Sequence, residues 1–443
     1  MRVTYYYSAC VAVSTRDVSV LCDPWFTEGV YDGAWYHWPP IDGDPVEFVG
    51  KHDFIYVSHL HPDHYDAQFL HSYLESYPEA QIIVAEGLPG KLLSSRMEKD
   101  GLECKSVQVM ALGATILYLV AAGPGEIDSA LLVARGDESV ANMNDCIVGD
   151  QSTYKKVREL LGGSPSMALL SYTGAGSYPQ SWVYPDHFLQ IAASHKQLGF
   201  LGTYETKRYL LQAKVNMPFA GQYLLGGRLA DRNWARGAAD AVDVLAFDPS
   251  AIVLQPRCWY DITTGEAAGM QVGPDAGEIV SALRTERLPS YVEHAELISK
   301  NPMAYDFDDE PELELREWRA AAKRASSREE IEMDFWFAFP TDANGTATLL
   351  ESERFCLVNV KSDANEVVLV DSYNAVWETT SGHPLAVVTV PPQYLRGLIR
   401  GRYHWNNCEV GSQWTVQWVN QEAEQLGKYA EKWLWNFSVG ATA

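Results

Sequence analysis

The densest group of chemically useful side chains is the segment Ser58-His59-Leu60-His61-Pro62-Asp63-His64-Tyr65-Asp66, which contains three of the chain's eleven histidines. Alternate residues of an extended segment point to the same side, so His59 and His61 can converge on one metal ion. Asp63 and His64 follow on a turn and can face a second ion. Imidazole together with carboxylate suits zinc, iron or manganese. Solvated loop histidines would not explain this spacing directly behind an apolar strand.

The elements around the cluster must hold it in place. The apolar run 54–57 predicts a buried strand immediately before it, and Asp66 is placed to cap a helix that reaches about Tyr77. The opening strands are predicted to be antiparallel, because turn residues separate the second from the third. We expect further helices after Ser152, near 186–196 and near 204–214, and strands at 3–7, 11–14, 18–21, 107–110, 116–120, 129–133, 140–142 and 167–171. This order predicts a layered α/β domain over residues 1–245.

The second half, residues 246–443, reads as a smaller α+β domain. Residues 275–330 are predicted to be mostly helical, with a capping box at 327–330 and an acidic stretch from Asp306 to Glu314 that we interpret as a solvated helix face. Strands are expected at 335–339, 355–360, 367–371 and 386–390, and a helix from Pro391 to Gly401. A final helix over 414–436 would bury Trp414, Trp418, Trp433 and Trp435 in a core or oligomer contact.

Length and charge exclude some classes of protein. The 443 residues favour two domains, and a formal net charge of −24 disfavours nucleic acid and anionic membrane as partners. The sequence contains no apolar run long enough for a transmembrane helix, and its N-terminus lacks the layout of a signal peptide. The seven cysteines are scattered and odd in number, which favours a reducing cytoplasm.

The motif His-x-His-x-Asp-His after a strand resembles the signature of the metallo-β-lactamase fold. The resemblance implies an αββα sandwich with one or two metal ions at its edge, followed here by the smaller α+β domain. In that fold an aspartate at the position of Asp23, within Leu21-Cys22-Asp23-Pro24-Trp25, often supports the metal ligands from outside.

Several short matches resemble one branch of this superfamily, the metallo-β-lactamase-like part of CMP-N-acetylneuraminate hydroxylases and their bacterial relatives. They are Asp23-Pro24-Trp25, Asp128-Ser129-Ala130-Leu131-Leu132, Asn142-Met143-Asn144-Asp145-Cys146, Tyr172-Thr173-Gly174-Ala175-Gly176-Ser177-Tyr178-Pro179, Pro218-Phe219-Ala220-Gly221 and Arg402-Tyr403-His404-Trp405-Asn406-Asn407. The hydroxylases also carry a Rieske iron–sulfur domain. Its Cys/His pairs are absent from this sequence, so an oxygenase of this kind would need a separate electron donor.

The expected ligand set departs from that of the hydrolytic members. Those enzymes add a middle histidine, a bridging aspartate and a last histidine. Asp145 fits the bridging position, with Asp150 as a rival, whereas carboxylates replace the middle histidine and Ala220 stands near the last one. His187 is more readily an ordinary helix residue. The predicted metal ligands are therefore His59, His61, Asp63, His64, Glu126, Asp128 and Asp145, of which Asp63 and Asp145 are assigned catalytic roles.

A carboxylate-rich site favours iron or manganese over zinc. The resulting hypothesis is a non-haem diiron oxygenase or hydroxylase that acts on a small molecule, similar to the diiron β-hydroxylase of chloramphenicol biosynthesis in replacing a histidine by a carboxylate. The first alternative is a zinc hydrolase of a phosphoester, ester or amide, in which the metal lowers the pKa of its water to about 7. The second is a degenerate fold kept as a metal- or ligand-binding module.

Two aromatic segments have open roles. Residues 23–40 place Trp25, Phe26, Tyr31, Trp35, Tyr36, His37 and Trp38 in one loop. That loop either contacts the substrate above the metals or packs against the second domain. For residues 403–407 we favour a place at the domain interface over a substrate contact.

Overall fold

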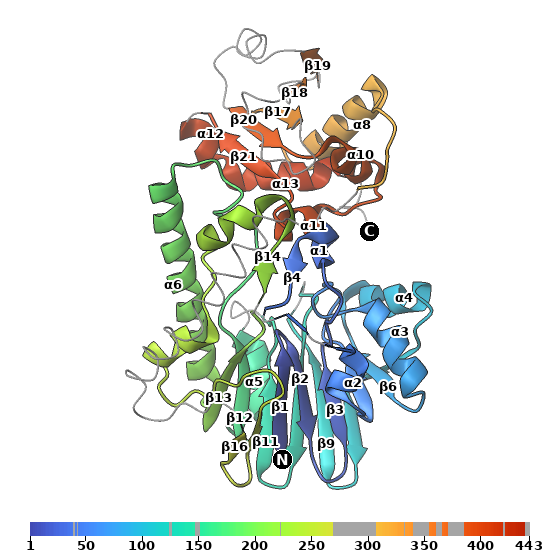
Figure 1. Cartoon of the computed structure of the whole chain (residues 1–443), viewed down its shortest axis with the longest axis vertical. Coiled ribbons are helices and arrows are strands. Elements are labelled where there is room, and N and C mark those ends of the chain that lie inside the picture. Colours follow the sequence, from blue (N-terminus) through green and yellow to red (C-terminus); the bar gives the residue numbers. More distant parts are fainter. Residues whose placement is uncertain are drawn as a thin grey trace.

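The computed structural model describes residues 1–268, apart from 39, 42, 124–125, 147–150 and 222. It also describes residues 307–438, apart from 332, 340–353, 360–365, 371–384 and 420. Figure 1 shows two bodies stacked along the long axis, a larger sandwich that contains the N-terminus and a smaller domain above it. The sandwich is built from two sheets that pack face to face.

The first sheet has eight strands in the order β16-β15-β1-β2-β3-β5-β6-β7. Its opening strands β1, β2 and β3 are antiparallel, as predicted, and β3, β5, β6 and β7 are parallel. The strands span Arg2–Tyr7 (β1), Cys10–Ser14 (β2), Ser19–Cys22 (β3), Phe54–Tyr56 (β5), Gln81–Ala85 (β6), Cys104–Val107 (β7), Trp259–Asp261 (β15) and Ala267–Ala268 (β16).

The second sheet has six strands in the order β13-β12-β11-β10-β9-β8. The strands β8 to β11 are antiparallel, and β11, β12 and β13 are parallel. They span Val109–Leu112 (β8), Thr115–Ala121 (β9), Ser129–Arg135 (β10), Glu138–Asn142 (β11), Met167–Ser171 (β12) and Val215–Phe219 (β13). A separate ribbon pairs β4 (Trp35–Tyr36) with β14 (Leu224–Leu225).

Both sheets are buried on both faces, which explains their nearly continuous apolar runs. Between the sheets, side chains such as Val11, Val20, Leu117 and Leu131 form one core. A second core joins the outer face of the first sheet to α2 (Pro45–Val49), α3 (Ala67–Ser76) and α4 (Leu92–Lys99). A third joins the outer face of the second sheet to α5 (Gln151–Leu160), α6 (Asp186–Leu211) and η3 (Ala241–Ala246). This αββα layering confirms the predicted fold class.

The sandwich differs from the prediction in three local features. The strand expected over 107–110 is two strands, because β7 ends at Val107 in one sheet and β8 begins at Val109 in the other. The two expected helices near 186–196 and 204–214 are the single helix α6, whose buried face on the second sheet outweighs its internal glycines. The helix α5 begins at Gln151, so Ser152 lies inside it and does not cap it.

The first sheet also extends beyond the boundary expected near residue 245. The strand β15 pairs antiparallel with β1, with Arg2 opposite Asp261, and β16 pairs with β15. This pairing covers the backbone edge that β1 would otherwise expose. The N-terminal sandwich therefore runs to Ala268.

The C-terminal domain has a five-stranded sheet in the order β19-β18-β17-β20-β21, in which β17 and β20 are parallel. One face of the sheet packs with helices around Trp318, Tyr394 and Trp433, which gives the predicted α+β architecture. The elements are α8 (Leu315–Ser326), β17 (Asp334–Phe339), β18 (Arg354–Asn359), β19 (Glu366–Val370), β20 (Leu385–Thr389), α10 (Pro392–Arg400), α11 (Trp405–Val410), β21 (Thr415–Trp418), α12 (Gln421–Gln425) and α13 (Gly427–Phe437).

The Trp-rich stretch is not one helix. Its first part is the strand β21 and its second part is α12 and α13, because the β20 edge offers a hydrogen-bonding partner that the helical spacing does not reveal. Trp414 and Trp433 are nevertheless fully buried in one core, as expected. Ser327 ends α8, and the capping box lies at the start of that helix, on Glu314 and Glu317. The helical structure expected over 275–306 falls outside the described residues.

The acidic stretch is also not a solvated helix face. Its described part, residues 307–314, is not helical, and its carboxylates bind arginines of α10 and the turn after it. Arg400 Nη1 lies 3.0 Å from Glu310 Oε2, and Arg402 Nη1 lies 2.8 Å from Asp308 Oδ2. We call residues 307–317 the acidic strap. Asp306 lies outside the described residues.

The two bodies meet through backbone and side-chain contacts. Val183 N donates to Val416 O at 2.8 Å, and Val416 N donates to Ser181 O at 2.8 Å. The strand β21 thus forms a short parallel bridge with residues 181–183 of the sandwich. Beside this contact, α1 (Val30–Gly33) packs against α11 (Figure 1). In the part of the chain that the structure describes, no helix combines the length and the apolar character that a bilayer crossing requires.

Candidate metal centre

The histidine segment leaves the first sheet where β5 ends. Val57 N still donates to Ile83 O, and the chain then turns, with His64 N donating to His61 O at 2.9 Å. Asp66 accepts a hydrogen bond from Phe69 N at 2.9 Å and begins α3, as predicted. The Asp66 carboxylate also accepts from the backbone of residues 26 and 27, so it serves the loop and not a metal.

Three imidazoles converge inside this turn. His59 Nε2 and His61 Nδ1 lie 2.8 Å apart, and the ring centroids of His59 and His64 are 4.2 Å apart. His59 and His64 are almost fully buried. The predicted same-side placement of His59 and His61 is therefore what the structure shows.

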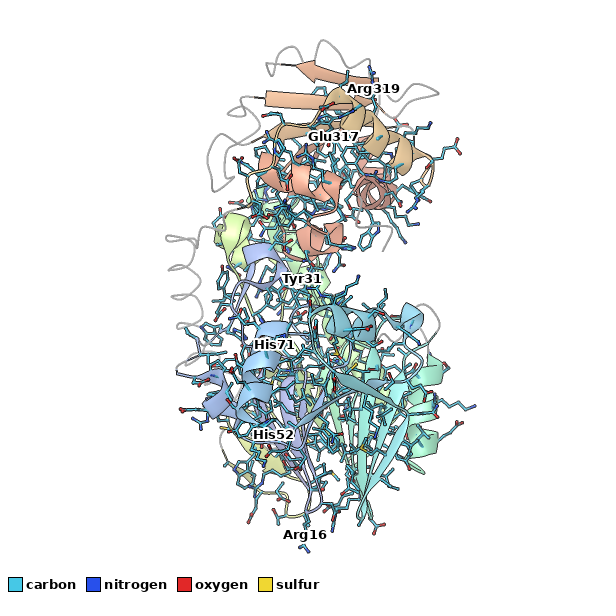
Figure 2. All side chains as sticks on the ribbon, turned by 90° about the vertical axis from the view of Figure 1, so that its right-hand side faces the viewer. Arg16, Tyr31, His52, His71, Glu317 and Arg319 are labelled. Carbon is cyan, nitrogen blue, oxygen red and sulfur yellow. The ribbon has the colours of Figure 1, made fainter. Side chains whose placement is uncertain are left out.

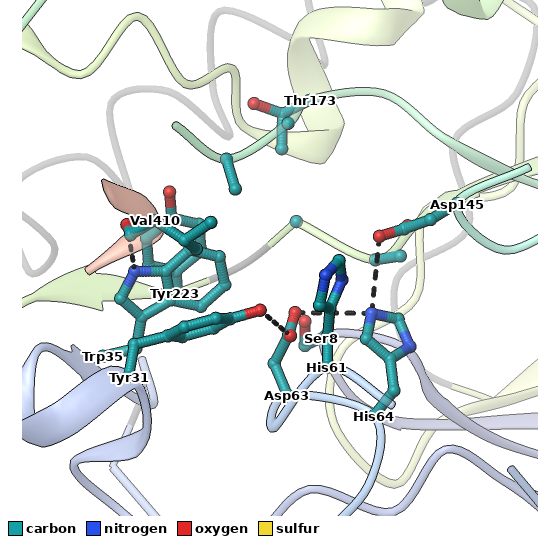
Figure 3. Close-up of a pocket in the computed structure, with 14 residues that line it drawn as sticks. Ser8, Tyr31, Trp35, His61, Asp63, His64, Asp145, Thr173, Tyr223 and Val410 are labelled. Carbon is teal, nitrogen blue, oxygen red and sulfur yellow. Dashed lines mark hydrogen bonds and ion pairs between the residues drawn. The ribbon is translucent and has the colours of Figure 1, made fainter. Parts of the chain in front are cut away.

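Two carboxylates approach the third imidazole. His64 Nε2 lies 3.3 Å from Asp63 Oδ2 and 3.5 Å from Asp145 Oδ2 (Figure 3). Asp145 follows β11 in the second sheet, so both sheets contribute to the group. Donor atoms of His59, His64 and Asp145 all lie within 4.8 Å of one another. This arrangement of nitrogen and carboxylate oxygen donors fits one or two divalent metal ions.

The other ring nitrogens of His59 and His64 face carboxylates behind the centre. His59 Nδ1 lies 3.0 Å from Asp128 Oδ1, and His64 Nδ1 lies 3.3 Å from Asp23 Oδ2. A carboxylate beside Nδ1 helps to orient the ring so that Nε2 faces the metal, and at His59 the same nitrogen also lies 2.9 Å from Ser58 Oγ. We predicted Asp128 as a ligand, but it lies behind His59, beside Nδ1, as Asp23 lies behind His64. The reason is that β10 begins at Ser129 and places its side chain behind His59.

Asp23 joins three strand ends. It follows β3, accepts a hydrogen bond from Ser58 N after β5 at 2.7 Å, and accepts another from Asn144 Nδ2 after β11 at 2.7 Å. Its backbone adopts the left-handed conformation, with φ of 43°. Asp23 thus lies where the resemblance implied, and it ties the two sheets together directly behind His64.

Burial and mutual charge shift the protonation of these groups. Burial lowers the pKa of His64, but Asp63 and Asp145 outweigh that effect and raise it well above the usual range. Burial raises the pKa of Asp63, but His64 and His61 bring it below its usual range. Burial and the two neighbouring imidazoles lower the pKa of His59 well below normal. His59 is therefore neutral and ready to bind a metal, whereas His64 must first release a proton.

A cavity of about 100 Å³ opens onto the metal ligands. Its far side is aromatic, and the rings of Trp35 and Tyr223 stack with centroids 3.5 Å apart. Thr173 Oγ1 is buried on the wall and has no hydrogen-bond partner among the described residues. The cavity is lined by Ser8, Tyr31, Trp35, His61, Asp63, His64, Asp145, Thr173, Gly174, Ala175, Ala220, Gly221, Tyr223 and Val410 (Figure 3).

The aromatic loop lies between the cavity and the C-terminal domain. Tyr31 and Trp35 line the cavity, and Trp35 Nε1 also donates to Val410 O of the C-terminal domain at 3.2 Å. In the 403–407 segment, Asn407 Nδ2 lies 3.4 Å from Asp32 Oδ1, so this segment contributes to the domain interface.

Two further positions lie away from the cavity, and His187 is, as expected, an ordinary helix residue. Glu126, which we predicted as a ligand, does not line the cavity, although burial and, to a lesser degree, its charge raise the pKa of the nearby Asp128. His187 is exposed near the start of α6 and packs on Phe188. Asp150 lies outside the described residues. Ala220, directly after β13, lies on the cavity wall, so the position expected for a last histidine faces the site without a donor.

Sequence reasoning missed two polar contacts. The Tyr31 hydroxyl donates to Asp63 Oδ1 at 2.5 Å, although Tyr31 lies in a segment whose pattern signals only aromatic packing. Lys207, buried in α6, donates to Ser171 Oγ at 2.6 Å, and burial lowers its pKa while Asp145 opposes that shift. A lysine on a helix gives no sign in the sequence that it is buried.

Comparison with known proteins agrees with the N-terminal fold. The family model described as beta-lactamase superfamily domain matches residues 2–125. A protein of Mycobacterium tuberculosis that is named for a Rieske 2Fe-2S cluster is 30% identical over 197 residues, which cover 42% of this chain and 37% of that protein. Cytidine monophosphate-N-acetylneuraminic acid hydroxylase of Danio rerio is 24% identical over 238 residues, which cover 50% of this chain and 38% of the hydroxylase. The matched segments thus span less than half the length of these relatives.

Solved structures give a looser likeness. The diiron beta-hydroxylase CmlA from Streptomyces venezuelae aligns with a TM-score of 0.39 at 14% identity, over 61% of this chain and 54% of that one. A possible metal-dependent hydrolase from Veillonella parvula aligns with a TM-score of 0.41 at 13% identity, over 61% of this chain and 99% of that one. The family match over residues 2–125 and the two facing sheets support a metallo-β-lactamase-like fold for the N-terminal part of the chain.

Proposed function

We propose that the chain is a metal-dependent hydroxylase of a small molecule. Iron would bind at the centre formed by His59, His61, Asp63, His64 and Asp145. The observation that carries this proposal is the donor set around His64. Asp63 and Asp145 supply carboxylates there, and Ala220 occupies the wall where a further histidine would complete a dizinc hydrolase site. Oxygen-rich donor sets favour iron or manganese over zinc.

The inner donors fit two ions. His59 Nε2 and His61 Nδ1 would hold one ion, and Asp63, His64 Nε2 and Asp145 the other. Because these donors are few, each ion would keep positions for other ligands. Iron bound in such a site supplies reductive activation of dioxygen for hydroxylation of a C–H or N–H bond.

The surroundings support small-molecule chemistry shielded from water. The stacked rings of Trp35 and Tyr223 offer an apolar surface for the substrate, and Thr173 Oγ1 offers a hydrogen bond to one of its polar groups. Asp63 and Asp145, which hold the proton of His64 before metal binding, are the groups placed to accept or return protons during turnover.

The relatives support the same reading. The matched acetylneuraminic acid hydroxylase is a hydroxylase by name, and the mycobacterial protein is named for an iron–sulfur cluster. We propose that a separate iron–sulfur or flavin protein delivers electrons to this chain.

Metal analysis of protein purified from iron-supplemented cells tests the proposal. We expect close to two iron ions per chain with a Mössbauer signature of coupled ferric ions. After anaerobic reduction we expect reoxidation by dioxygen on mixing.

Other outcomes would decide for the alternatives. Stoichiometric zinc with turnover of a generic phosphodiester would overturn the hydroxylase in favour of a hydrolase. Absence of any tightly bound metal, with zinc and iron both supplied, would favour a binding module.

A further inference from the structure

The short element α1 has an unusual backbone. Tyr31 and Asp32 both adopt the left-handed conformation, with φ of 55° and 56°, and glycines at 29 and 33 flank them with φ of 77° and 88°. Left-handed backbone is unfavourable for residues with a Cβ, and two such residues in succession are rare. Contacts outside the turn must therefore hold it in place.

The first of the two residues reaches the metal ligands. The Tyr31 hydroxyl donates to Asp63 Oδ1 at 2.5 Å, while Asp63 Oδ2 lies 3.3 Å from His64 Nε2. Tyr31 thus binds one carboxylate oxygen and leaves the other directed at the centre (Figure 3). The side chain is almost fully buried. Its hydrogen bond fixes the orientation of the Asp63 carboxylate.

The second residue is held by the C-terminal domain. The Tyr394 hydroxyl of α10 donates to Asp32 Oδ2 at 2.6 Å, and Asn407 Nδ2 of α11 lies 3.4 Å from Oδ1. Gln413 Nε2 donates to the Asp32 backbone carbonyl at 2.7 Å. Figure 2 places Tyr31 at the level where the two bodies meet.

The approach of the two domains is close at this turn. A Cβ atom added to Gly411, directly after α11, would lie 2.7 Å from the Tyr31 carbonyl oxygen. The C-terminal domain therefore contacts the turn through both backbone and side chains. A shift of that domain would have to move the turn.

We propose that Asp32 is a positioning residue through which the C-terminal domain sets the Tyr31–Asp63 hydrogen bond and so the affinity of the metal ion beside Asp63. The inference rests on the metal site of the proposed function. Partners that orient a metal ligand from outside typically change metal affinity roughly 10–100-fold. The C-terminal domain would then complete the metal centre without supplying a ligand.

Titration of the metal-free full-length chain with Co²⁺, followed by visible absorption, tests this coupling. Tyr31→Phe, Asp32→Ala and Tyr394→Phe should each weaken one of two Co²⁺ equivalents roughly 10–100-fold and leave the other unchanged. The double variant Tyr31→Phe/Asp32→Ala should bind no more weakly than Tyr31→Phe, because both changes remove the same hydrogen bond. Tyr184→Phe is the matched control, since it removes a different interdomain hydrogen bond, to Glu424.

Each contrary result has a distinct meaning. Additive losses in the double variant, or equal weakening by Tyr184→Phe, would overturn the positioning role, because Asp32 would then act through general domain docking. If thermal unfolding shows that Asp32→Ala is misfolded, Tyr394→Phe decides, because it removes one hydroxyl. Unchanged affinity in every variant would overturn this inference alone, whereas a wild-type chain that binds no Co²⁺ would overturn the proposed function with it.

Discussion

Acidic side chains gather in two regions of this molecule, and the cations that face them differ. In the metal centre, Asp63 and Asp145 face His64. In the acidic strap, Glu310 and Asp308 face Arg400 and Arg402. A guanidinium is permanently charged and has no lone pair, so an arginine–carboxylate pair is complete as it stands. An imidazole can exchange its proton for a metal ion.

This difference separates a structural cluster from a chemical one. Among the described residues that line the cavity at the metal centre there is neither lysine nor arginine. In the acidic strap, by contrast, the carboxylates form ion pairs with arginines of α10. These pairs hold the segment before α8 against the C-terminal core. The comparison predicts that changes in one region alter metal binding and changes in the other alter stability.

Removing an inner imidazole should have the largest effect. His61→Ala should abolish metal loading at its site, because His61 Nδ1 and His59 Nε2 together form that half of the donor set. Metal content per folded chain, measured by elemental analysis, checks the result. The control is His71→Ala, which changes an exposed histidine of α3 that binds only the Asp100 carbonyl. Unchanged metal content in His61→Ala would refute the ligand assignment.

A change behind the ligands should weaken the metal without removing it. Asp128→Ala deletes the carboxylate at His59 Nδ1, so we expect roughly 10–100-fold weaker binding with unchanged stoichiometry at saturation. Calorimetric titration with Zn²⁺ separates affinity from stoichiometry. Loss of one equivalent at saturation would instead restore Asp128 to the ligand role that the sequence suggested. Glu126→Ala, a neighbouring carboxylate that does not line the cavity, is the control.

The sequence predicted the centre better than its surroundings, and the reason is physical. His59, His61, Asp63 and His64 are close along the chain, so local geometry alone brings them together. Asp145 and Asp23 required a resemblance, because Asp145 reaches the centre only when the two sheets pack and Asp23 only when β3 pairs with β5. Tyr31 and the orientation of Asp128 depend on which way a side chain turns within that packing, which residue spacing does not encode.

The same distinction explains the errors in the C-terminal domain. The strap carries the charge pattern of a solvated helix, but its arginine partners lie more than eighty residues later in the chain. Trp414 and Trp418 have helical spacing, yet Trp418 belongs to a strand that pairs with the edge of β20, and Trp414 lies just before that strand. Long-range partners outweighed local propensity in both cases.

Breaking the strap should reduce stability and spare the metal. Arg400→Met leaves the buried Glu310 carboxylate with fewer partners, so we expect a loss of about 1–3 kcal/mol in the free energy of unfolding. Urea denaturation measures the loss, and metal content should match that of the wild type. Arg316→Met, which removes an exposed pair with Glu314, should cost less than about 1 kcal/mol. A drop in metal content with Arg400→Met would contradict the separation of the two regions.

The last effect depends on pH and concerns a carboxylate that pairs with neither a metal-centre histidine nor an arginine among the described residues. Burial, and then the nearby Glu409, raise the pKa of Glu431 in α13 from its ordinary 4.5 to about 7. The folded state thus holds the proton more tightly than the unfolded state. The stabilising contribution is present below pH 4.5 and is lost as the pH rises to about 7.

Between these values the wild type should lose stability relative to Glu431→Gln, which keeps an uncharged side chain of the same size. Unfolding free energies at pH 4.5, 6 and 8 should show the two chains diverging, whereas Glu422→Gln, exposed on α12, should follow the wild type. Parallel pH profiles for the wild type and Glu431→Gln would show that folding does not shift the pKa of Glu431, and the contrast between paired and unpaired acids would then not extend to this helix.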